Sequence, residues 1–106
     1  MSEDVVSVFY HGRSFVRDNK SVLVYINENV KRFFPMDVEL ICFFDLKKKF
    51  LDLGYHDYKT MYWYDPTSTT LESILHSIHG VKEIRTLQKN KIQNQNMDEC
   101  YIYFDQ

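Results

Sequence analysis

The sequence predicts an α+β fold in which one main helix packs across one face of a sheet. The first observation is a set of apolar residues at helical spacing within residues 42–54, which form one stripe: Phe43, Leu46, Phe50 and Leu53. The second is the alternation of residues 58–65, and the third is the same alternation in the closing segment, residues 99–105. A helix with so wide an apolar stripe needs a sheet to cover, and the alternating segments supply one.

The predicted helix has a polar side and a defined end. Its charged residues fall opposite the apolar stripe, where we expect solvent: Asp45, Lys48, Lys49 and Asp52. Gly54 follows as a stop, since a residue without a Cβ adopts the left-handed conformation most easily. In the strand that follows, Met61 and Trp63 face the helix, and the alternate positions face away from it: Tyr58, Thr60, Tyr62 and Tyr64.

The N-terminal forty residues are predicted to form short extended segments joined by turns. In chain order we expect a strand at 5–11, a strand at 15–17 that pairs back with it as a hairpin, a turn at 18–20, a strand at 21–26, a turn at 27–29, and extended segments at 30–34 and 36–40. Pro35 separates the last two segments, which is typical of a sheet edge or a crossover.

The C-terminal half contains one segment whose structure stays open. Thr69 with Glu72 fits a helix-capping box, but Leu71 to Ile78 fits a short strand equally well. A short second helix is expected to begin near Gly80, followed by a polar loop at 90–96. In the closing strand, every second residue is expected to face the core: Cys100, Ile102 and Phe104.

Length and composition limit the class of protein. The 106 residues, 44% hydrophobic and 16% aromatic, are expected to form a single packed domain over residues 1–106. A net charge of −2 gives no general attraction to nucleic acid or to a membrane surface, and the apolar runs are too short to span a bilayer. The acidic N-terminus is unlike a secretory signal and the two cysteines are isolated, so we expect a cytoplasmic or nuclear protein.

No residue pattern predicts catalysis. His76 and His79 would share a helical face and could hold a metal ion, but no further ligands lie nearby in the sequence. Cys100 could be paired with a histidine as a nucleophile, but its alternation with Ile102 is typical of a buried packing cysteine. We therefore expect no catalytic residue, no cofactor and no metal site.

Two sets of side chains are candidates for binding a partner. The first is basic and lies in the N-terminal third: Arg13, Arg17, Lys20, Lys31 and Arg32. The second is aromatic and is expected on the sheet face away from the helix: Phe9, Tyr62, Tyr64, Tyr101 and Tyr103. A protein partner, including a second copy of this chain, fits these sets best. The alternative is a nucleic-acid-binding module that stacks bases on the aromatic face, although the chain lacks the basic surplus of such modules.

Several short motifs, spread over nearly the whole chain, resemble the Phox-and-Bem-one-like (PB-one-like) domain of plants. This domain occurs alone or at the N-terminus of Mutator-type transposases and their relatives. The matching pieces are His11-Gly12, Tyr25, Asp37 with Glu39, Leu53-Gly54-Tyr55, Tyr62-Trp63-Tyr64-Asp65-Pro66 and Tyr101-Ile102-Tyr103. The resemblance implies a ubiquitin-like β-grasp fold, with a mixed sheet of four to five strands, and a role in protein–protein association.

The chain departs from the family pattern in its charges. Animal and fungal relatives pair a basic face, built around a first-strand lysine, with an acidic loop. Here the first strand has no lysine, the loop after Tyr64 offers only Asp65 and Glu72, and Arg13 replaces a second glycine. The fold is therefore expected to carry over better than the head-to-tail charge pairing. We expect a monomer, or a closed dimer that uses the tyrosines of the open sheet face.

Overall fold

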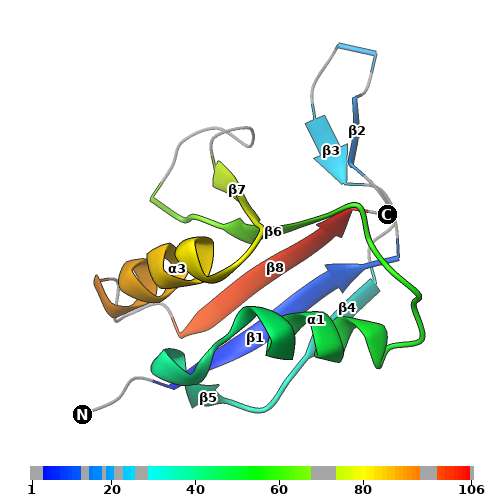
Figure 1. Ribbon diagram of the computed structural model, residues 1–106. Helices are drawn as coiled ribbons and strands as arrows, with labels where there is room; N and C mark the ends of the chain where they lie inside the picture. The colour runs from blue at the N-terminus through cyan, green and yellow to red at the C-terminus, as the bar shows by residue number, and fades with distance from the viewer. Residues whose placement is uncertain are drawn as a thin grey trace.

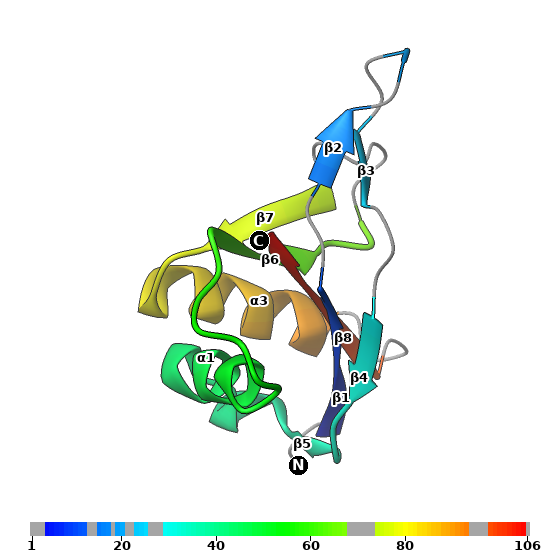
Figure 2. The ribbon, with the colours of Figure 1, turned by 90° about the vertical axis from the view of Figure 1, so that its right-hand side faces the viewer.

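A mixed six-stranded sheet forms one layer of the molecule, and both described α-helices lie on the same side of it (Figures 1 and 2). The computed structural model describes residues 4–12, 15–17, 19–20, 23–25, 29–67, 74–93 and 98–105. The strands of this sheet are β1 (Asp4–His11), β4 (Asn29–Arg32), β5 (Met36–Asp37), β6 (Thr60–Tyr64), β7 (Leu75–Ile78) and β8 (Glu99–Asp105). The helices are the 3-10 turn η1 (Val38–Leu40), α1 (Phe43–Leu51) and α3 (Val81–Gln93).

The strand order is β4-β1-β8-β6-β7, with β5 paired beside β4 on the start of β1. β1 and β8 are parallel, whereas the other paired neighbours are antiparallel. This arrangement confirms the α+β class and is compatible with the ubiquitin-like β-grasp fold. The sixth strand beyond the expected five is the two-residue β5.

The N-terminal hairpin is longer than expected and pairs differently. We predicted that β2 (Phe15–Arg17) would pair with β1, and this is wrong. β2 pairs with β3 (Leu23–Tyr25) in a separate two-stranded sheet. The β2–β3 pairs keep the register of the β1–β4 pairs, so the two pairings are successive parts of one hairpin. The chain reverses at the turn containing Asn19 and Lys20, as predicted, and the β2–β3 part stands apart from the main sheet (Figure 1).

The stripe of α1 is buried as its spacing predicts. Leu46 and Phe50 are fully buried, and Phe43 and Leu53 pack against them at the margin of the core. Cys42 caps the helix through its Sγ, which accepts the Asp45 N–H at 3.4 Å. Gly54 has a φ of 108°, so the predicted left-handed stop is confirmed.

α3 begins after Gly80, as expected, but it is longer than α1. The segment 90–93, which we assigned to a polar loop, forms its last turn; residues 94–96 lie outside the described part of the chain. The reason is a core stripe, Ile84, Leu87 and Lys91, whose last member is a lysine and so escaped the apolar pattern. The side-chain amide of Gln88 donates to the Val38 and Ile41 carbonyls at 3.2 and 3.0 Å, which fastens α3 to the η1 segment.

The segment before α3, which the sequence could not assign to helix or strand, contains a strand. Leu75–Ile78 is β7, an edge strand paired with β6, and residues 68–73, including the Thr69–Glu72 capping box, lie outside the described residues. His76 and His79 therefore do not share a helical face.

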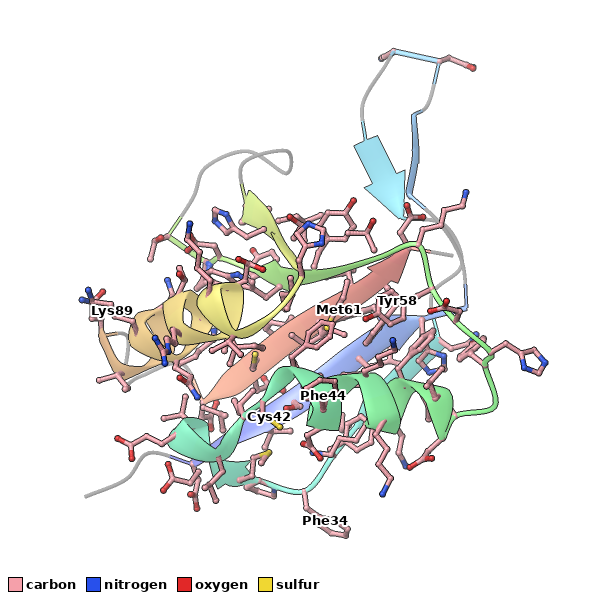
Figure 3. All side chains as sticks on the ribbon, in the orientation of Figure 1. Phe34, Cys42, Phe44, Tyr58, Met61 and Lys89 are labelled. Carbon is pink, nitrogen blue, oxygen red and sulfur yellow. The ribbon has the colours of Figure 1, made fainter. Side chains whose placement is uncertain are left out.

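The core lies between the sheet and the two helices. Met61 and Trp63 of β6, and Cys100, Ile102 and Phe104 of β8, are buried there as predicted. The alternation assigned two aromatic residues wrongly, because Phe9 and Tyr58 also belong to this side. Phe9 is fully buried, with its ring centroid 4.9 Å from that of Phe104, and Tyr58 packs edge-on against Phe50 and Phe104 (Figure 3).

Polar groups are enclosed with these apolar residues too: the Ser7 hydroxyl, the Lys91 ammonium and the Cys100 thiol. Lys91 is only 2% exposed, and burial lowers its pKa from the usual 10.5. The Cys100 thiol is buried on β8, and burial raises its pKa to about 11. A buried ammonium is penalised unless it is well paired, and no hydrogen bond to the Lys91 ammonium is seen among the described residues.

Phe50→Ala tests the phase of α1. The Phe50 ring stacks on Phe104 and Tyr55 with centroids 4.1 and 4.7 Å apart, so its removal should cost about 3–5 kcal/mol of unfolding free energy. The exposed Lys48→Ala variant is the control and should change stability by less than about 0.5 kcal/mol. Equal urea midpoints for the two variants would show that the buried face of α1 is wrong.

The two cysteines should label at different rates. Cys42 is exposed and Cys100 is buried and protonated, and both are free thiols. A thiol reagent at neutral pH should therefore modify Cys42 rapidly and Cys100 only when urea unfolds the chain, because the thiolate is the reactive form. Mass spectrometry measures the labelling of each cysteine. Rapid modification of Cys100 in the native protein would contradict its placement in the core.

Lys91→Met should stabilise the protein near neutral pH by about 1 kcal/mol or more, because it removes a buried charge and replaces it with an apolar side chain of similar length. The folded state disfavours protonated Lys91, so this penalty is fully present below the lowered pKa. It disappears as the pH rises through that pKa toward 10.5. The stability difference between variant and wild type, measured by urea unfolding, should therefore shrink as the pH is raised. A variant that is less stable at every pH would show that Lys91 is favourably paired.

Candidate protein-interaction surface

Five tyrosines gather on the sheet face opposite the two helices. We call this surface the tyrosine face and define it by Tyr10 of β1, Tyr62 and Tyr64 of β6, and Tyr101 and Tyr103 of β8. The strand register brings them together, because Tyr10 lies level with Tyr103, and Tyr103 with Tyr62. All five side chains are half-buried, and no described helix covers them (Figure 2). Four of these tyrosines were predicted here, and Tyr10 takes the place that we had assigned to Phe9.

The tyrosine rings contact one another across three strands. Tyr10 stacks on Tyr103 with centroids 4.5 Å apart and planes inclined by 7°. Tyr101 lies 6.1 Å from Tyr10 and meets Tyr64 edge-on at 5.8 Å. Because four of the five rings contact another tyrosine ring, this part of the surface is preorganised: a partner would lose little side-chain freedom on binding it.

The margin of the tyrosine face carries charges of both signs. Arg32 of β4 forms an ion pair with Glu99 of β8, and the Tyr101 hydroxyl donates to the other Glu99 oxygen at 3.0 Å. Asp105 lies on the same face, opposite Thr60. Asp4 and its partner Asp37 fall on the same face by strand alternation, so the carboxylates outnumber Arg32 among the described residues of this face, which does not favour a polyanion such as nucleic acid.

The described members of the predicted basic set, Lys20, Lys31 and Arg32, are not brought together as one cluster. Lys31 and Arg32 are neighbours in β4, so they project to opposite faces: Arg32 reaches Glu99, and Lys31 lies over the Phe33 ring with its Nζ 5.9 Å from the centroid. Lys20 is exposed at the far β2–β3 turn. Arg13 and the side chain of Arg17 lie outside the described residues.

The one acidic loop residue that the structure describes is already engaged within the chain. Asp65 follows β6 and accepts bonds from the Thr67 N–H at 2.9 Å and the Asn90 amide at 3.2 Å, and it lies 2.9 Å from His76 Nε2. Burial raises the pKa of Asp65, but the hydrogen bonds of Thr67 and His76 outweigh burial and hold it below its usual value. With only 13% of its side chain exposed, Asp65 is poorly placed to pair with another molecule.

A shallow groove lies between β7 and α3. Two hollows of about 190 and 250 Å³ share Trp63, His76 and Thr86 in their walls. The His76 ring stacks on Trp63 at 4.8 Å, and Lys82 and Lys89 line the two hollows from α3. Asp65 and Glu83 line them too, so the groove has no dominant charge, and sequence patterns did not indicate it.

Two of the recognised motifs meet in space. The His11 ring Nδ1 lies 2.8 Å from the Tyr55 hydroxyl, which joins the end of β1 to the loop after α1. Gly12 has a φ of 99°, and a Cβ there would collide with the Asn29 side-chain amide. The His11-Gly12 and Leu53-Gly54-Tyr55 motifs are therefore explained by packing, and burial lowers the pKa of His11.

Within the described ranges, no three metal-ligating side chains form a group, and no helix is long and apolar enough to cross a membrane. The histidines we considered as ligands are occupied differently: His76 contacts Asp65 and Trp63, and the His79 backbone N–H donates to Glu83 at 2.8 Å.

Comparison with known proteins agrees with the fold and the motifs. The family model of the PB1-like domain matches residues 1–104. No curated protein and no solved structure gives a significant match. Because the family match covers almost the whole sequence and the sheet has the expected architecture, the chain belongs to the PB1-like domain family.

Proposed function

We propose that this PB1-like domain is a non-catalytic module that binds a protein partner through the tyrosine face. PB1-like domains are generally protein-interaction modules. The observation that carries the proposal is the array of five half-buried tyrosines on the sheet face opposite both described helices, four of which are in ring contact with one another. Tyrosine suits such a surface because its ring supplies apolar contact area while its hydroxyl remains hydrated until a partner binds.

The charges support this mode of binding over head-to-tail pairing. A head-to-tail chain needs a free acidic patch on one side and a free basic patch on another, since the same heterologous contact repeats. Here Asp65 is held by Thr67, Asn90 and His76, and Arg32 is held by Glu99. Exposed ion pairs contribute only about 0–1 kcal/mol each, too little to hold micromolar subunits together.

Self-association is the form of binding that can be tested first. A second copy would place tyrosine against tyrosine in a closed dimer around a twofold axis, with no free interface left for growth. A monomer at all concentrations would leave the tyrosine face for a different protein.

The nucleic-acid alternative makes a different prediction. Base stacking on the tyrosines would need cations to hold the phosphates, and the described part of this face has more carboxylates than cations. Titration of the protein into a fluorescent single-stranded oligonucleotide at low salt should give no saturable change in anisotropy. Tight binding that weakens steeply with salt would favour the alternative.

We expect a monomer or a closed dimer, and a dimer formed through the tyrosine face should persist in high salt, because apolar burial is not screened by ions. The double change Tyr62→Ser with Tyr103→Ser should weaken this dimer about tenfold or more, as measured by sedimentation equilibrium at low and high salt. Phe44→Ser is the matched control, since Phe44 is an exposed aromatic on α1, away from this face (Figure 3). Thermal unfolding of each variant checks that the fold survives. Open-ended oligomers that dissociate as salt rises would instead support charge pairing.

A further inference from the structure

The outer edge of β4 has the features of a strand-addition site. β4 ends the strand order of the main sheet, and all four of its residues are exposed (Figure 1). An edge strand presents unpaired backbone groups that can bind an extended peptide, and the side chains beside it decide which peptide fits. This site adjoins the tyrosine face at Val30 and Arg32 but does not depend on the function proposed above.

The hydrogen-bond register shows which backbone groups point outward. The Phe33 N–H donates to the Ser7 carbonyl of β1 at 2.9 Å. In an antiparallel ladder, opposed residues alternate between pairs that exchange hydrogen bonds and pairs that exchange none. The register Val8–Arg32 and Tyr10–Val30 therefore belongs to the second kind. It follows that the N–H and C=O groups of Val30 and Arg32 point away from β1, off the edge of the sheet.

A bulge sets the end of this edge. Ser7 lies level with Phe33 and Val5 with Met36, so Phe34 and Pro35 both stand opposite Val6. Pro35 has no N–H to donate, which interrupts the row of backbone donors between β4 and β5. Phe34 is 93% exposed and projects from the molecule beside the edge (Figure 3), and Val30 is 52% exposed. Val30 shares its side of the strand with Arg32, whose charge is paired with Glu99, and Val30 and Phe34 both offer apolar contact to a peptide.

The other side of the edge is basic. Lys31 and Lys49 both lie over the Phe33 ring, with Nζ atoms 5.9 and 5.5 Å from its centroid. Asp45 neutralises part of this charge, since it accepts from Lys49 at 2.7 Å, while Lys31 forms no ion pair with the described residues. Every second side chain of an added strand would lie on the same face as Lys31. A carboxylate is favoured at the position beside Lys31.

The same charges disfavour a second copy as the occupant. In an antiparallel pairing of two β4 strands centred on Lys31, the two Lys31 side chains would lie directly opposite each other, and like charges at that position are destabilising. Edge lysines are a known protection against such self-pairing. An acidic segment from another protein has no such conflict.

We propose that the edge of β4 binds an extended segment of a partner protein in which acidic residues alternate with apolar ones. The segment pairs with the outward backbone groups of Val30 and Arg32. Its carboxylates lie beside Lys31, and its apolar residues lie beside Val30 and Phe34.

The test uses a short capped peptide in which aspartate alternates with valine, titrated into ¹⁵N-labelled protein. Binding should slow the exchange of the Val30 and Arg32 amide protons with solvent, while that of Phe33, already bonded to Ser7, serves as the internal control. A peptide of the same composition with aspartates and valines in adjacent pairs should bind more weakly. A lysine–valine peptide should not bind the wild type.

Variants separate backbone pairing from simple charge attraction. Val30→Pro removes an outward N–H without breaking a bond to β1, and it should weaken binding about tenfold. Val30→Thr keeps the N–H and should bind within about twofold of the wild type. Lys31→Glu should reverse the preference toward the lysine–valine peptide. Circular dichroism checks the fold of each variant.

Four outcomes would overturn the proposal. Unchanged affinity in folded Val30→Pro, or binding without added protection of the Val30 and Arg32 amides, would mean that the peptide does not pair with the edge. Loss of binding in the Tyr62→Ser, Tyr103→Ser protein but not in Val30→Pro would place the peptide on the tyrosine face. No binding at millimolar peptide would leave the edge lysines as protection against aggregation only.

Discussion

The parallel pairing of β1 with β8 holds the two halves of the sheet together. β4 and β5 pair with β1, and β7 pairs with β6, so each half is an antiparallel unit that meets the other only through β8. The inward residues of β8, Cys100, Ile102 and Phe104, complete the core beneath the helices, and its outward residues, Tyr101 and Tyr103, complete the tyrosine face. A strand from the C-terminal end of the chain therefore decides both stability and the candidate binding surface. Such non-local pairing also carries the largest loop-closure cost in folding.

The two faces of the sheet have different environments and hence different residues. The covered face is filled by aliphatic and aromatic side chains. Among them, the Phe104 ring stacks on Phe50 and also contacts the Phe9 ring. The other face carries tyrosines that contact each other at the ring and keep the hydroxyl at the surface. Val8 is fully buried on that face, which shows how densely the side chains around it pack. The tyrosine face is therefore a formed surface, and its neighbour β4 adds an unpaired backbone edge with Arg32 common to both.

Internal contacts occupy the charged side chains that charge pairing in the family manner would need. Asp65 stabilises the turn after β6 and ties it to α3 through Asn90, and Glu99 is shared by Arg32 and Tyr101. A side chain that is already hydrogen-bonded within its own molecule must lose those bonds before it can pair with another, so its net contribution to association is small.

Local periodicity was sufficient where one face of an element is apolar and the other polar. The stripe of α1, the stop at Gly54 and the inward residues of β6 and β8 follow from spacing alone, because a helix repeats near 3.6 residues and a strand every two. The motifs on these elements were enough to indicate the family. Only the tertiary structure decided which face of β1 is inward, because both of its faces carry apolar residues and the polar Ser7 lies on the buried one. It also decided the partner of β2, the inward turn of Tyr58, the extension of α3 through the buried Lys91, and the separation of Lys31 from Arg32. Each of these depends on contacts between residues far apart in the chain, which no local pattern records.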